Sequence, residues 1–575
     1  MQQCHKRTSG LFWLTLSLAV LATPSAALAQ CSVDVARVSQ QASEIHEHFT
    51  RRDWAGVVRL AGPLSARSAD VNFDYGLALA HLRQWSAARA ALLGGARQCP
   101  RQKRFPTELA GVAFEQKRYP EAAAWLQKSL KIEPGDSYAN NFAATVYYLM
   151  GNLDAALKYW NRVQKPYIAA LHFDPQLRLQ RQILDRSFAF SPAAVLRRPE
   201  YEATESRLRS LGIFPSFTIA LNAHTDGEFD AAFHAIEQNG FGSTRLAAIV
   251  STFAGAAYET IYPSYMNARG SATNFQSLLR WDKEKRRVWV SVSAPLYGRP
   301  DWRWQLSADA RNENWVIRRS FTGDAPPLGS LNLEIESITA AVTAIASGRW
   351  QWSTAAELSH RTFRNVTDGS ALNPELTSHG YEFKYRAAME DKVFVVPERH
   401  FSVIADASSE TARLWSSSAH LFEKLEGSAL ARWFPLAQAD TYQLSQHLRA
   451  GRIFATTPLD ELYLLGMERD SDLDLRGQIG TRDGRKGSSP LGDQYFLSNT
   501  DFSRRLYSNG LFTLQAGPLF DIAKVGAPTS GLSPKQWIFD TGVAAKLTVL
   551  GTSVVLTYGH DLRAGSNAFY GTLAR

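Results

Sequence analysis

The sequence predicts an α+β protein in three parts: an N-terminal α-solenoid (residues 30–165), a small α/β domain (residues 166–239) and a C-terminal transmembrane β-barrel (residues 240–575). Two observations lead to this prediction. The first part has the apolar spacing of amphipathic helices, and the last part alternates apolar and polar residues with period two. The mean hydropathy of −0.23 fits a barrel, because lipid-facing and lumen-facing residues alternate along each strand and their contributions cancel.

Residues 1–29 are expected to form a secretory signal peptide. This stretch begins with basic residues, continues through the apolar residues 11–22 and ends with small residues up to Ala29, so cleavage is expected before Gln30. A lipoprotein signal that attaches lipid to Cys31 is the alternative interpretation, although Gln30 is a poor residue directly before such a cysteine.

Secretion from the cytoplasm affects which disulfide bonds and which binding partners we expect. An oxidising compartment allows a disulfide between Cys31 and Cys99, the two cysteines outside the signal peptide. The formal net charge of +9 includes no basic run long enough for a nucleic-acid-binding arm. We therefore expect no nucleic-acid partner and interpret the charge as that of a solvated surface.

The helical part, residues 30–165, contains a repeat of 34 residues. A small residue, an alanine and a proline recur at this spacing, first as Gly76, Ala88 and Pro100 and then as Ala110, Ala122 and Pro134. This pattern resembles the tetratricopeptide repeat. The resemblance implies stacked helix pairs with a concave surface for a peptide or a partner protein. A plain helical bundle with accidental spacing is the alternative.

The middle part, residues 166–239, reads as strand, helix, helix, strand, strand. The expected segments are residues 168–173, 177–185, 201–211, 216–223 and 228–237. Asp226 and Gly227 separate the last two strands, which is a hairpin signal. The order, together with the exit of the second helix at residues 211–214, resembles a polypeptide-transport-associated (POTRA) domain. Another kind of small α/β domain is the alternative.

The last part, residues 240–575, consists of alternating segments such as residues 288–293 and 302–306. A sheet in lipid must close on itself, because an open edge would leave backbone groups without hydrogen bonds in hydrocarbon. The 336 residues correspond to sixteen strands at 21 residues per strand and loop, which suits strands of about 9–11 residues. The alternative is a water-soluble all-β domain, whose exposed faces should carry more charge.

The candidate functional residues lie in a glycine-rich region late in the chain. Arg476 and Gly477 precede a long loop, residues 478–490, Gly466 comes before them, and Asp521 lies on a later strand. A guanidinium inside a barrel needs a carboxylate, which its planar fork can bind through two hydrogen bonds. Gly477 allows a close backbone approach. We expect Arg476 to pair with Asp521 in the lumen; the alternative is that Arg476 is an ordinary solvated loop residue.

This arrangement is similar to the C-terminal half of the outer-membrane surface-antigen superfamily, which includes BamA, TamA and the two-partner secretion transporters. The resemblance covers roughly residues 166–575 and implies POTRA domains before a sixteen-stranded barrel. It also implies a lumen loop whose arginine meets a strand aspartate, here Arg476 and Asp521. The sequence departs from the family pattern at Gln478, Leu519 and Ala523, and its final residues lack the terminal aromatic.

The resemblance implies a factor that inserts proteins into the outer membrane or translocates polypeptides across it. Its working site would be a weakly paired gap between the first and last strands, expected near residues 241–253 and 567–575. The N-terminal parts would lie in the periplasm of a Gram-negative cell and recruit a polypeptide client or a partner protein. Outer-membrane lipid would surround the barrel.

No enzyme is expected. The sequence has no Gly-x-Ser-x-Gly motif of a serine hydrolase, and no pair of histidines with the helical spacing of a zinc site stands out. We therefore expect neither catalysis nor a cofactor nor a bound metal.

Two other functions combine similar parts. Polysaccharide exporters join tetratricopeptide repeats to a barrel of similar size with an open, polar lumen. Surface-lipoprotein assembly modulators join repeats to a smaller barrel. The loop of Arg476 is absent from both, and exporters also lack the domain expected at residues 166–239, so a loop folded into the lumen would favour the assembly factor.

Overall fold

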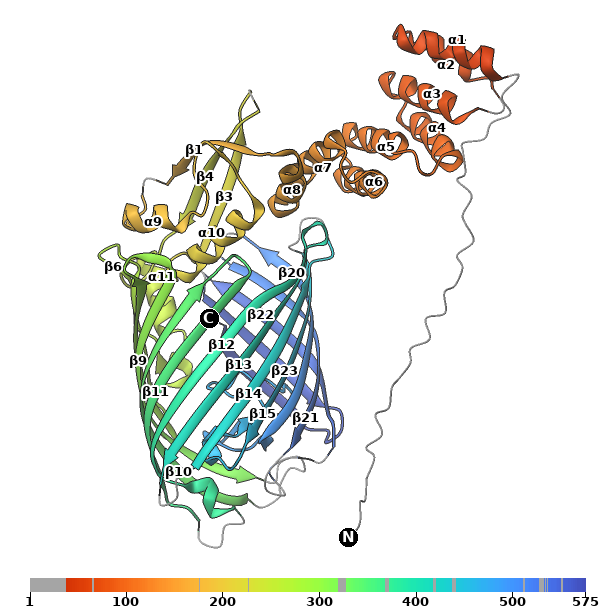
Figure 1. Ribbon diagram of the computed structural model, residues 1–575. Helices are drawn as coiled ribbons and strands as arrows, with labels where there is room; N and C mark the ends of the chain where they lie inside the picture. The colour runs from red at the N-terminus through yellow and green to blue at the C-terminus, as the bar shows by residue number, and fades with distance from the viewer. Residues whose placement is uncertain are drawn as a thin grey trace, which may run out of the picture. The chain divides into compact units, whose positions relative to one another are not determined.

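A computed structural model describes residues 38–574, except for residues 65–66, 175, 226, 319–326, 368–371, 417–419, 437–440, 510–511, 527–531, 533, 535 and 550–551. The chain divides into two compact units, Met1–Ala139 and Asn140–Arg575 (Figure 1). The predicted signal peptide and Cys31 lie outside the described residues. Cys99 is buried and disulfide-bonded, and its pairing with Cys31 stays a prediction.

The first unit is helical, as predicted. Its helices are α1 (Val38–Thr50), α2 (Trp54–Ala61), α3 (Ala69–His81), α4 (Trp85–Gln98), α5 (Arg104–Glu115), α6 (Tyr119–Ile132) and the start of α7 (Ser137–Leu149). Ala88, Ala110 and Ala122, which recur at the 34-residue spacing, are each 0% exposed. Side chains this small let neighbouring helices approach closely, and Leu92 and Phe105 fill the space between them.

Replacing each of two glycines of this unit with alanine is expected to have opposite effects on stability. A Cβ at Gly95 would lie 2.3 Å from the Phe105 ring, whereas a Cβ at Gly111 would meet only the Glu108 carboxylate, at 3.8 Å. We expect Gly95→Ala to destabilise the helices by about 1–3 kcal/mol through overpacking. Gly111→Ala should stabilise them by about 0.5–1 kcal/mol, because alanine favours helix. Urea unfolding of the full-length protein in detergent, followed by helical circular dichroism, measures both; equal midpoints would contradict the packing described.

The second unit begins with the rest of α7, α8 (Leu153–Trp160) and a small α/β domain. The elements of this domain are β1 (Tyr167–Phe173), α9 (Arg181–Ser187), β2 (Ala194–Val195), α10 (Arg198–Ser210), β3 (Ser216–Ala223) and β4 (Phe229–Ile236). Its sheet has the order β2-β1-β4-β3, with β1 parallel to β4. The strand-helix-helix-strand-strand order agrees with the sequence pattern, and β2 is an addition. Phe233, at 0% exposure, is the centre of its core.

A closed barrel forms the rest of this unit. Its wall strands are β5 (Thr260–Ile261), β6 (Ser264–Ala268), β7 (Thr273–Trp281), β8 (Lys285–Leu296), β9 (Arg299–Arg318), β10 (Pro327–Ile345), β11 (Trp350–Arg364), β12 (Gly380–Val396), β13 (Phe401–Trp415), β14 (His420–Trp433), β15 (Tyr442–Phe454), β20 (Gln494–Ser508), β21 (Phe512–Gly526), β22 (Ile538–Val549), β23 (Thr552–Asp561) and β24 (Asn567–Ala574). The long strands pair antiparallel with their neighbours.

The strand order differs in detail from the sixteen strands expected. Two short strands of a loop, β17 (Thr481–Arg482) and β18 (Arg485–Lys486), join the barrel order because Lys486 pairs with Trp315 of β9. The first wall strand is divided into β5 and β6. With these short strands, the described residues give a barrel order of 18 strands.

The two faces of the wall differ in polarity. Outward residues of neighbouring strands are apolar and exposed, for example Val290, Leu306, Ile338, Leu358 and Phe383. The alternate residues face the lumen and include buried charges. This is the pattern of a barrel whose outer surface contacts lipid. Separately, none of the helices in the described part of the chain is long and apolar enough to cross a membrane.

The prediction of a first strand near residues 241–253 is wrong. These residues include helix α11 (Arg245–Phe253), whose N-terminal backbone is capped by the Thr244 hydroxyl, which accepts a hydrogen bond from the Ala247 amide. Leu246, Ile249 and Phe253 are all exposed and have helical spacing. The helical spacing of these apolar residues therefore explains why the segment is a helix, and the described wall begins at β5.

Candidate functional site

The α/β domain contacts one end of the barrel, which we call the domain end. The side-chain amide of Asn274, at the start of β7, donates to the Leu211 carbonyl at 2.9 Å. The Ser210 hydroxyl donates to the Pro300 carbonyl at 3.0 Å. The opposite end is the far end. The chain leaves β15 and enters β20 at the far end, so the connecting residues 455–493, which we call the lumen loop, start and finish there.

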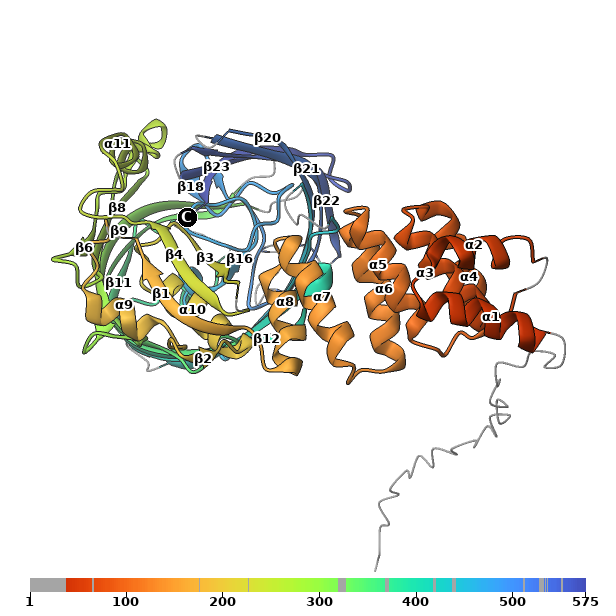
Figure 2. The ribbon, with the colours of Figure 1, turned by 90° about the horizontal axis from the view of Figure 1, so that it is seen from above.

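The lumen loop is folded into the barrel. It contains β16 (Tyr463–Leu464) paired with β19 (Leu491–Gly492), besides the hairpin β17–β18, and Figure 2 shows β16 inside the ring of wall strands. Leu465 and Leu475 of the loop are 0% exposed and belong to one apolar cluster with Phe422 and Leu497 of the wall. Burial of these leucines gives the loop a hydrophobic reason to occupy the lumen.

Arg476 and Asp521 are brought together by the structure. The Arg476 backbone amide donates to Asp521 Oδ2 at 2.9 Å, and its Nε donates to the same oxygen at 2.9 Å. Its terminal nitrogens donate to Asp521 and to Asp501 on β20. Asp521 also accepts from the Asn499 amide at 2.8 Å and is 0% exposed. Arg476 is therefore buried and donates hydrogen bonds to two carboxylates, Asp521 and Asp501, so it is not a solvated loop residue.

The residues after Arg476 continue this contact across the next two strands. The Gly477 amide donates to Asp540 Oδ2 at 2.6 Å, and the Gln478 side chain donates to Asp561 Oδ2 at 2.7 Å. A Cβ at Gly477 would lie 2.4 Å from the Asp540 carboxyl carbon, so only glycine fits there. Gln478, which departs from the family pattern, thus has a polar partner in this chain.

The carboxylates around the Arg476 segment form a row across the sheet. Asp521 of β21 is the register partner of Asp540 of β22, which is the partner of Asp561 of β23. Like charges opposite each other destabilise a sheet, so the donors from the loop help to stabilise this row. We call Asp501, Asp521, Asp540 and Asp561 the acidic row. Only Asp521 was expected from the sequence.

A second ionic cluster ties the loop to β7, β8 and β9. Asp470 accepts from Arg280 at 2.8 and 3.2 Å and from Arg287 at 2.8 Å. Glu468 accepts from Lys285 at 3.1 Å. Arg280 and both loop carboxylates are nearly fully buried.

A third cluster ties the start of the loop to β11, β12 and β14. Arg361, 1% exposed, donates to Glu461 at 2.9 Å, to Asp460 at 3.2 Å and to Glu382 at 2.8 Å. Lys384 lies 2.6 Å from Glu461, which also pairs with Lys424 of β14. The loop is therefore held to the wall on three sides. None of these basic wall residues was expected, because a lone charge in a strand usually indicates a solvated position.

Gly466 has a local role in the loop. Its amide donates to the Leu473 carbonyl at 3.0 Å, and a Cβ there would lie 2.6 Å from that of Ser489. Gly466 thus allows two parts of the loop to touch.

The junction between β24 and β5, which we call the seam, is the weakest part of the wall. β24 pairs with β23 over eight residue pairs, whereas the barrel order on its other side continues with β5, which has two residues. Arg469 of the lumen loop covers the Tyr258 ring at 3.9 Å beside this junction, and Arg280 Nε donates to the Thr260 hydroxyl at 3.3 Å. Both contacts lie on the β5 side of the junction, and β5 is the short strand that follows β24 in the barrel order.

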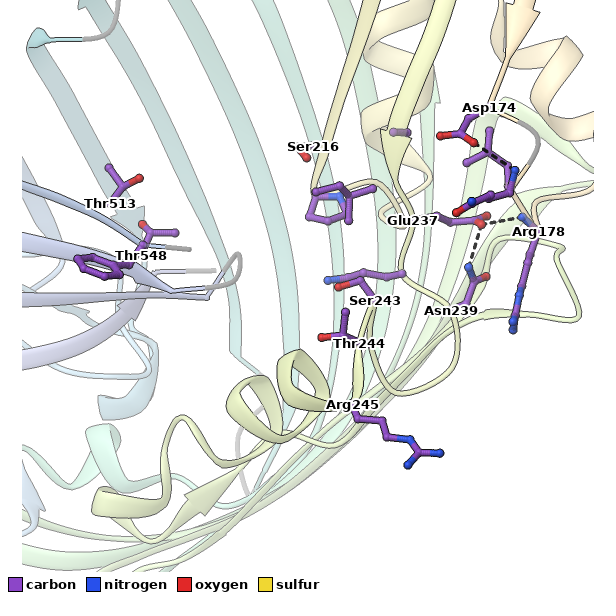
Figure 3. Close-up of a pocket in the computed structure, with 18 residues that line it drawn as sticks. Asp174, Arg178, Ser216, Glu237, Asn239, Ser243, Thr244, Arg245, Thr513 and Thr548 are labelled. Carbon is purple, nitrogen blue, oxygen red and sulfur yellow. Dashed lines mark hydrogen bonds between the residues drawn. The ribbon is translucent and has the colours of Figure 1, made fainter. Parts of the chain in front are cut away.

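A polar cavity of about 1080 Å³ lies where the α/β domain meets the barrel. Thr513 and Thr548 at the domain-end tips of β21 and β22 lie across it from Glu237 and Asn239 (Figure 3). The Glu237 carboxylate accepts from the Arg178 amide at 2.7 Å and from the Asn239 and Asn267 side chains at 2.8 and 2.9 Å. These hydrogen bonds give Glu237 a structural role. The polar lining of the cavity offers hydrogen-bonding groups to a ligand.

Helix α8 makes a further contact with the domain end. Lys158 Nζ and the Tyr159 hydroxyl lie 2.5 and 2.9 Å from Glu398 in the turn between β12 and β13, and the Asn152 amide donates to the Pro397 carbonyl at 2.8 Å. Burial tends to raise the pKa of Glu398, but the hydrogen bond from Lys158 and the other donors outweigh it and hold this pKa below the usual range. The carboxylate is therefore ionised in this contact at neutral pH.

The described residues contain no group of three or more histidine, cysteine, aspartate or glutamate side chains arranged to hold a metal ion. The candidate site consists of the lumen loop, the seam and the cavity.

Comparisons with known proteins give similarities at the level of solved structures. No protein-family model and no curated protein sequence matches the chain. CdiB from Escherichia coli is 13% identical, with a TM-score of 0.46 over 71% of this chain and 74% of that one. BamA from Haemophilus ducreyi lacking POTRA domains 1–3 is 11% identical, with a TM-score of 0.41 over 71% and 84%. CdiB from Acinetobacter baumannii is 10% identical, with a TM-score of 0.43 over 71% and 73%. The chain is therefore similar to solved structures of BamA and CdiB, among others.

Proposed function

We propose that this protein inserts polypeptides into the outer membrane, or moves them across it, at the seam of its barrel. The observation that carries this proposal is the edge of β24. In the described residues, its pairing away from β23 is limited to the two-residue strand β5. Unpaired backbone groups are costly in hydrocarbon, so this edge is a place where an incoming strand gains hydrogen bonds.

In this proposal the α/β domain guides the polypeptide to the domain end of the barrel. Strand β3 lies at the edge of its sheet, and its first residue, Ser216, lines the polar cavity. A polypeptide paired along β3 would therefore be led toward the cavity and the domain-end tips of β21 and β22. In this proposal the domain end faces the periplasm, and the helical repeats recruit the client or a partner protein.

The lumen loop favours a polypeptide over a polysaccharide as the substrate. A hydrated polymer needs an open polar channel, whereas here the leucines and ion pairs of the loop fill the lumen. Export of a sugar chain through the barrel would require three buried ionic clusters to break, at several kcal/mol for each uncompensated charge. Use of the seam leaves these clusters intact.

The proposal is tested with the full-length protein in liposomes and a urea-unfolded outer-membrane barrel protein as the client. We expect the client to fold faster than in empty liposomes, as measured by heat-modifiable mobility on gels. A photoreactive amino acid at Phe569, which is 68% exposed on β24, should crosslink to the client.

The control for the crosslinking is Phe520, a phenylalanine of β21 that is 38% exposed and lies away from the seam. Equal crosslinking at the two positions, or no acceleration of client folding, would count against insertion at the seam. Loss of exopolysaccharide release alone in a deletion strain would support the polysaccharide exporter instead.

A further inference from the structure

An arginine cluster surrounds the turn between β8 and β9 at the domain end. Tyr297 at the tip of this turn is 88% exposed. Arg186 of α9 donates to the carbonyl oxygens of Tyr297 and Gly298, both at 3.3 Å. Arg207 of α10 and Arg299 of β9 line the same cavity, which has a volume of about 560 Å³. Two helices of the α/β domain and one barrel turn thus place three guanidinium groups around one space.

The positive charge of this cavity is only partly neutralised. Its lining contains one carboxylate, Asp301, which lies 2.7 Å from Arg299. Arg207 donates from Nη1 to the Arg186 carbonyl at 3.4 Å, while its buried Nε has no hydrogen-bond partner in the described structure. Three arginines against one aspartate leave an excess of cationic donors, which suits an anion with several acceptor oxygens.

The cavity lies at the depth of lipid headgroups. The outward-facing Trp302 and Trp352 meet edge to face at 5.4 Å, and both are register partners of Ala344. Aromatic side chains of this kind mark the edge of the hydrocarbon layer in barrels. Arg299 precedes Trp302 by three residues, or roughly 10 Å along a strand. The headgroup layer extends about 5–8 Å beyond the hydrocarbon, so the arginine cavity opens beside it.

We propose that Arg186, Arg207 and Arg299 bind the phosphate of an anionic phospholipid at the domain end of the barrel. Tyr297 would lie among the headgroups, where its ring contacts the lipid and its hydroxyl stays solvated. The assignment of this leaflet to the periplasmic side rests on the proposed function, but the binding itself does not. The lipid would fix the α/β domain and the barrel turn to the same membrane surface.

The test measures lipid binding by the full-length protein in bilayer nanodiscs of phosphatidylethanolamine with a minor share of phosphatidylglycerol. Native mass spectrometry of the released protein counts bound phosphatidylglycerol. Arg186→Gln and Arg299→Gln should each weaken its binding about fivefold, which corresponds to about 1 kcal/mol per arginine near an anionic surface.

The control is Arg364→Gln at the far end. Arg364 lies 2.7 Å from Glu334 and its side chain is 59% exposed, against 58% for Arg299, so the two sites match except for position. Equal lipid binding by all variants would overturn the proposal. Inorganic phosphate, titrated onto the protein in detergent, should bind more weakly than the lipid; equal affinity would mean that free phosphate and not lipid is the ligand.

Two further measurements separate this proposal from the proposed function. Client folding is measured in phosphatidylcholine liposomes, which hold no anionic lipid, so its failure leaves the lipid result unaffected. Heat-modifiable mobility of each variant confirms that its barrel is folded, and a folded variant with unchanged binding counts against the site.

Discussion

Arg476→Ala is expected to destabilise the barrel by about 3–5 kcal/mol, because it leaves the buried Asp521 carboxylate without its cation. Asp521 would lose its guanidinium partner, while the backbone amide of residue 476 and the side-chain amide of Asn499 would remain as its donors. Asp501 would lose its ion pair as well. The loss is measured as a lower denaturant midpoint of the heat-resistant barrel form in detergent.

Two variants distinguish the role of Arg476 from a general effect of lost charge. Arg476→Lys keeps the charge but not the planar fork, so it should recover only part of the stability. Arg482→Ala removes an exposed arginine from the same loop and should change stability by less than about 0.5 kcal/mol. If Arg476→Ala were as stable as Arg482→Ala, the acidic row would not depend on the arginine.

Replacement of residues 460–490 by a short Gly-Ser linker is expected to open the lumen. The loop contributes apolar side chains to the core cluster of the barrel, and it supplies the partners of Arg280, Arg361 and Lys384. Without it, water and ions replace these contacts. We expect a severalfold higher conductance in planar bilayers than for the intact protein, which has the loop in its lumen.

The conductance result requires that the shortened protein still forms a barrel. Protease resistance and heat-modifiable mobility of the membrane-inserted protein report this independently. A folded, shortened barrel with unchanged conductance would contradict a lumen filled by the loop. Arg482→Ala serves again as the control, since the loop should stay in place in that variant.

The parts of the structure that follow local patterns could be predicted from the sequence. The repeated small residues Ala88, Ala110 and Ala122 predicted close helix packing, and each is fully buried. Period-two alternation predicted a barrel wall, and the chemistry of a buried guanidinium predicted a carboxylate partner for Arg476. These inferences need only the spacing of residues within one element or the properties of one side chain.

The rest depends on strand register, which a single sequence does not contain. Asp521, Asp540 and Asp561 come together only because two strand pairings, β21–β22 and β22–β23, fix their register. A slip by one residue would move a strand's side chains to the other face. Arg361 pairs with loop carboxylates almost one hundred positions later in the chain. The family resemblance places a first strand near residues 241–253, whereas Leu246, Ile249 and Phe253 have the helical spacing of α11.

The acidic row also constrains the order in which the barrel can be assembled. Strands β21, β22 and β23 place carboxylates opposite one another, and their repulsion opposes this pairing until Arg476, Gly477 and Gln478 donate to them. The donors precede these strands in the chain, so they are synthesised first and are present when the strands pair. We therefore expect entry of the loop and pairing of the last strands to be coupled when the barrel forms.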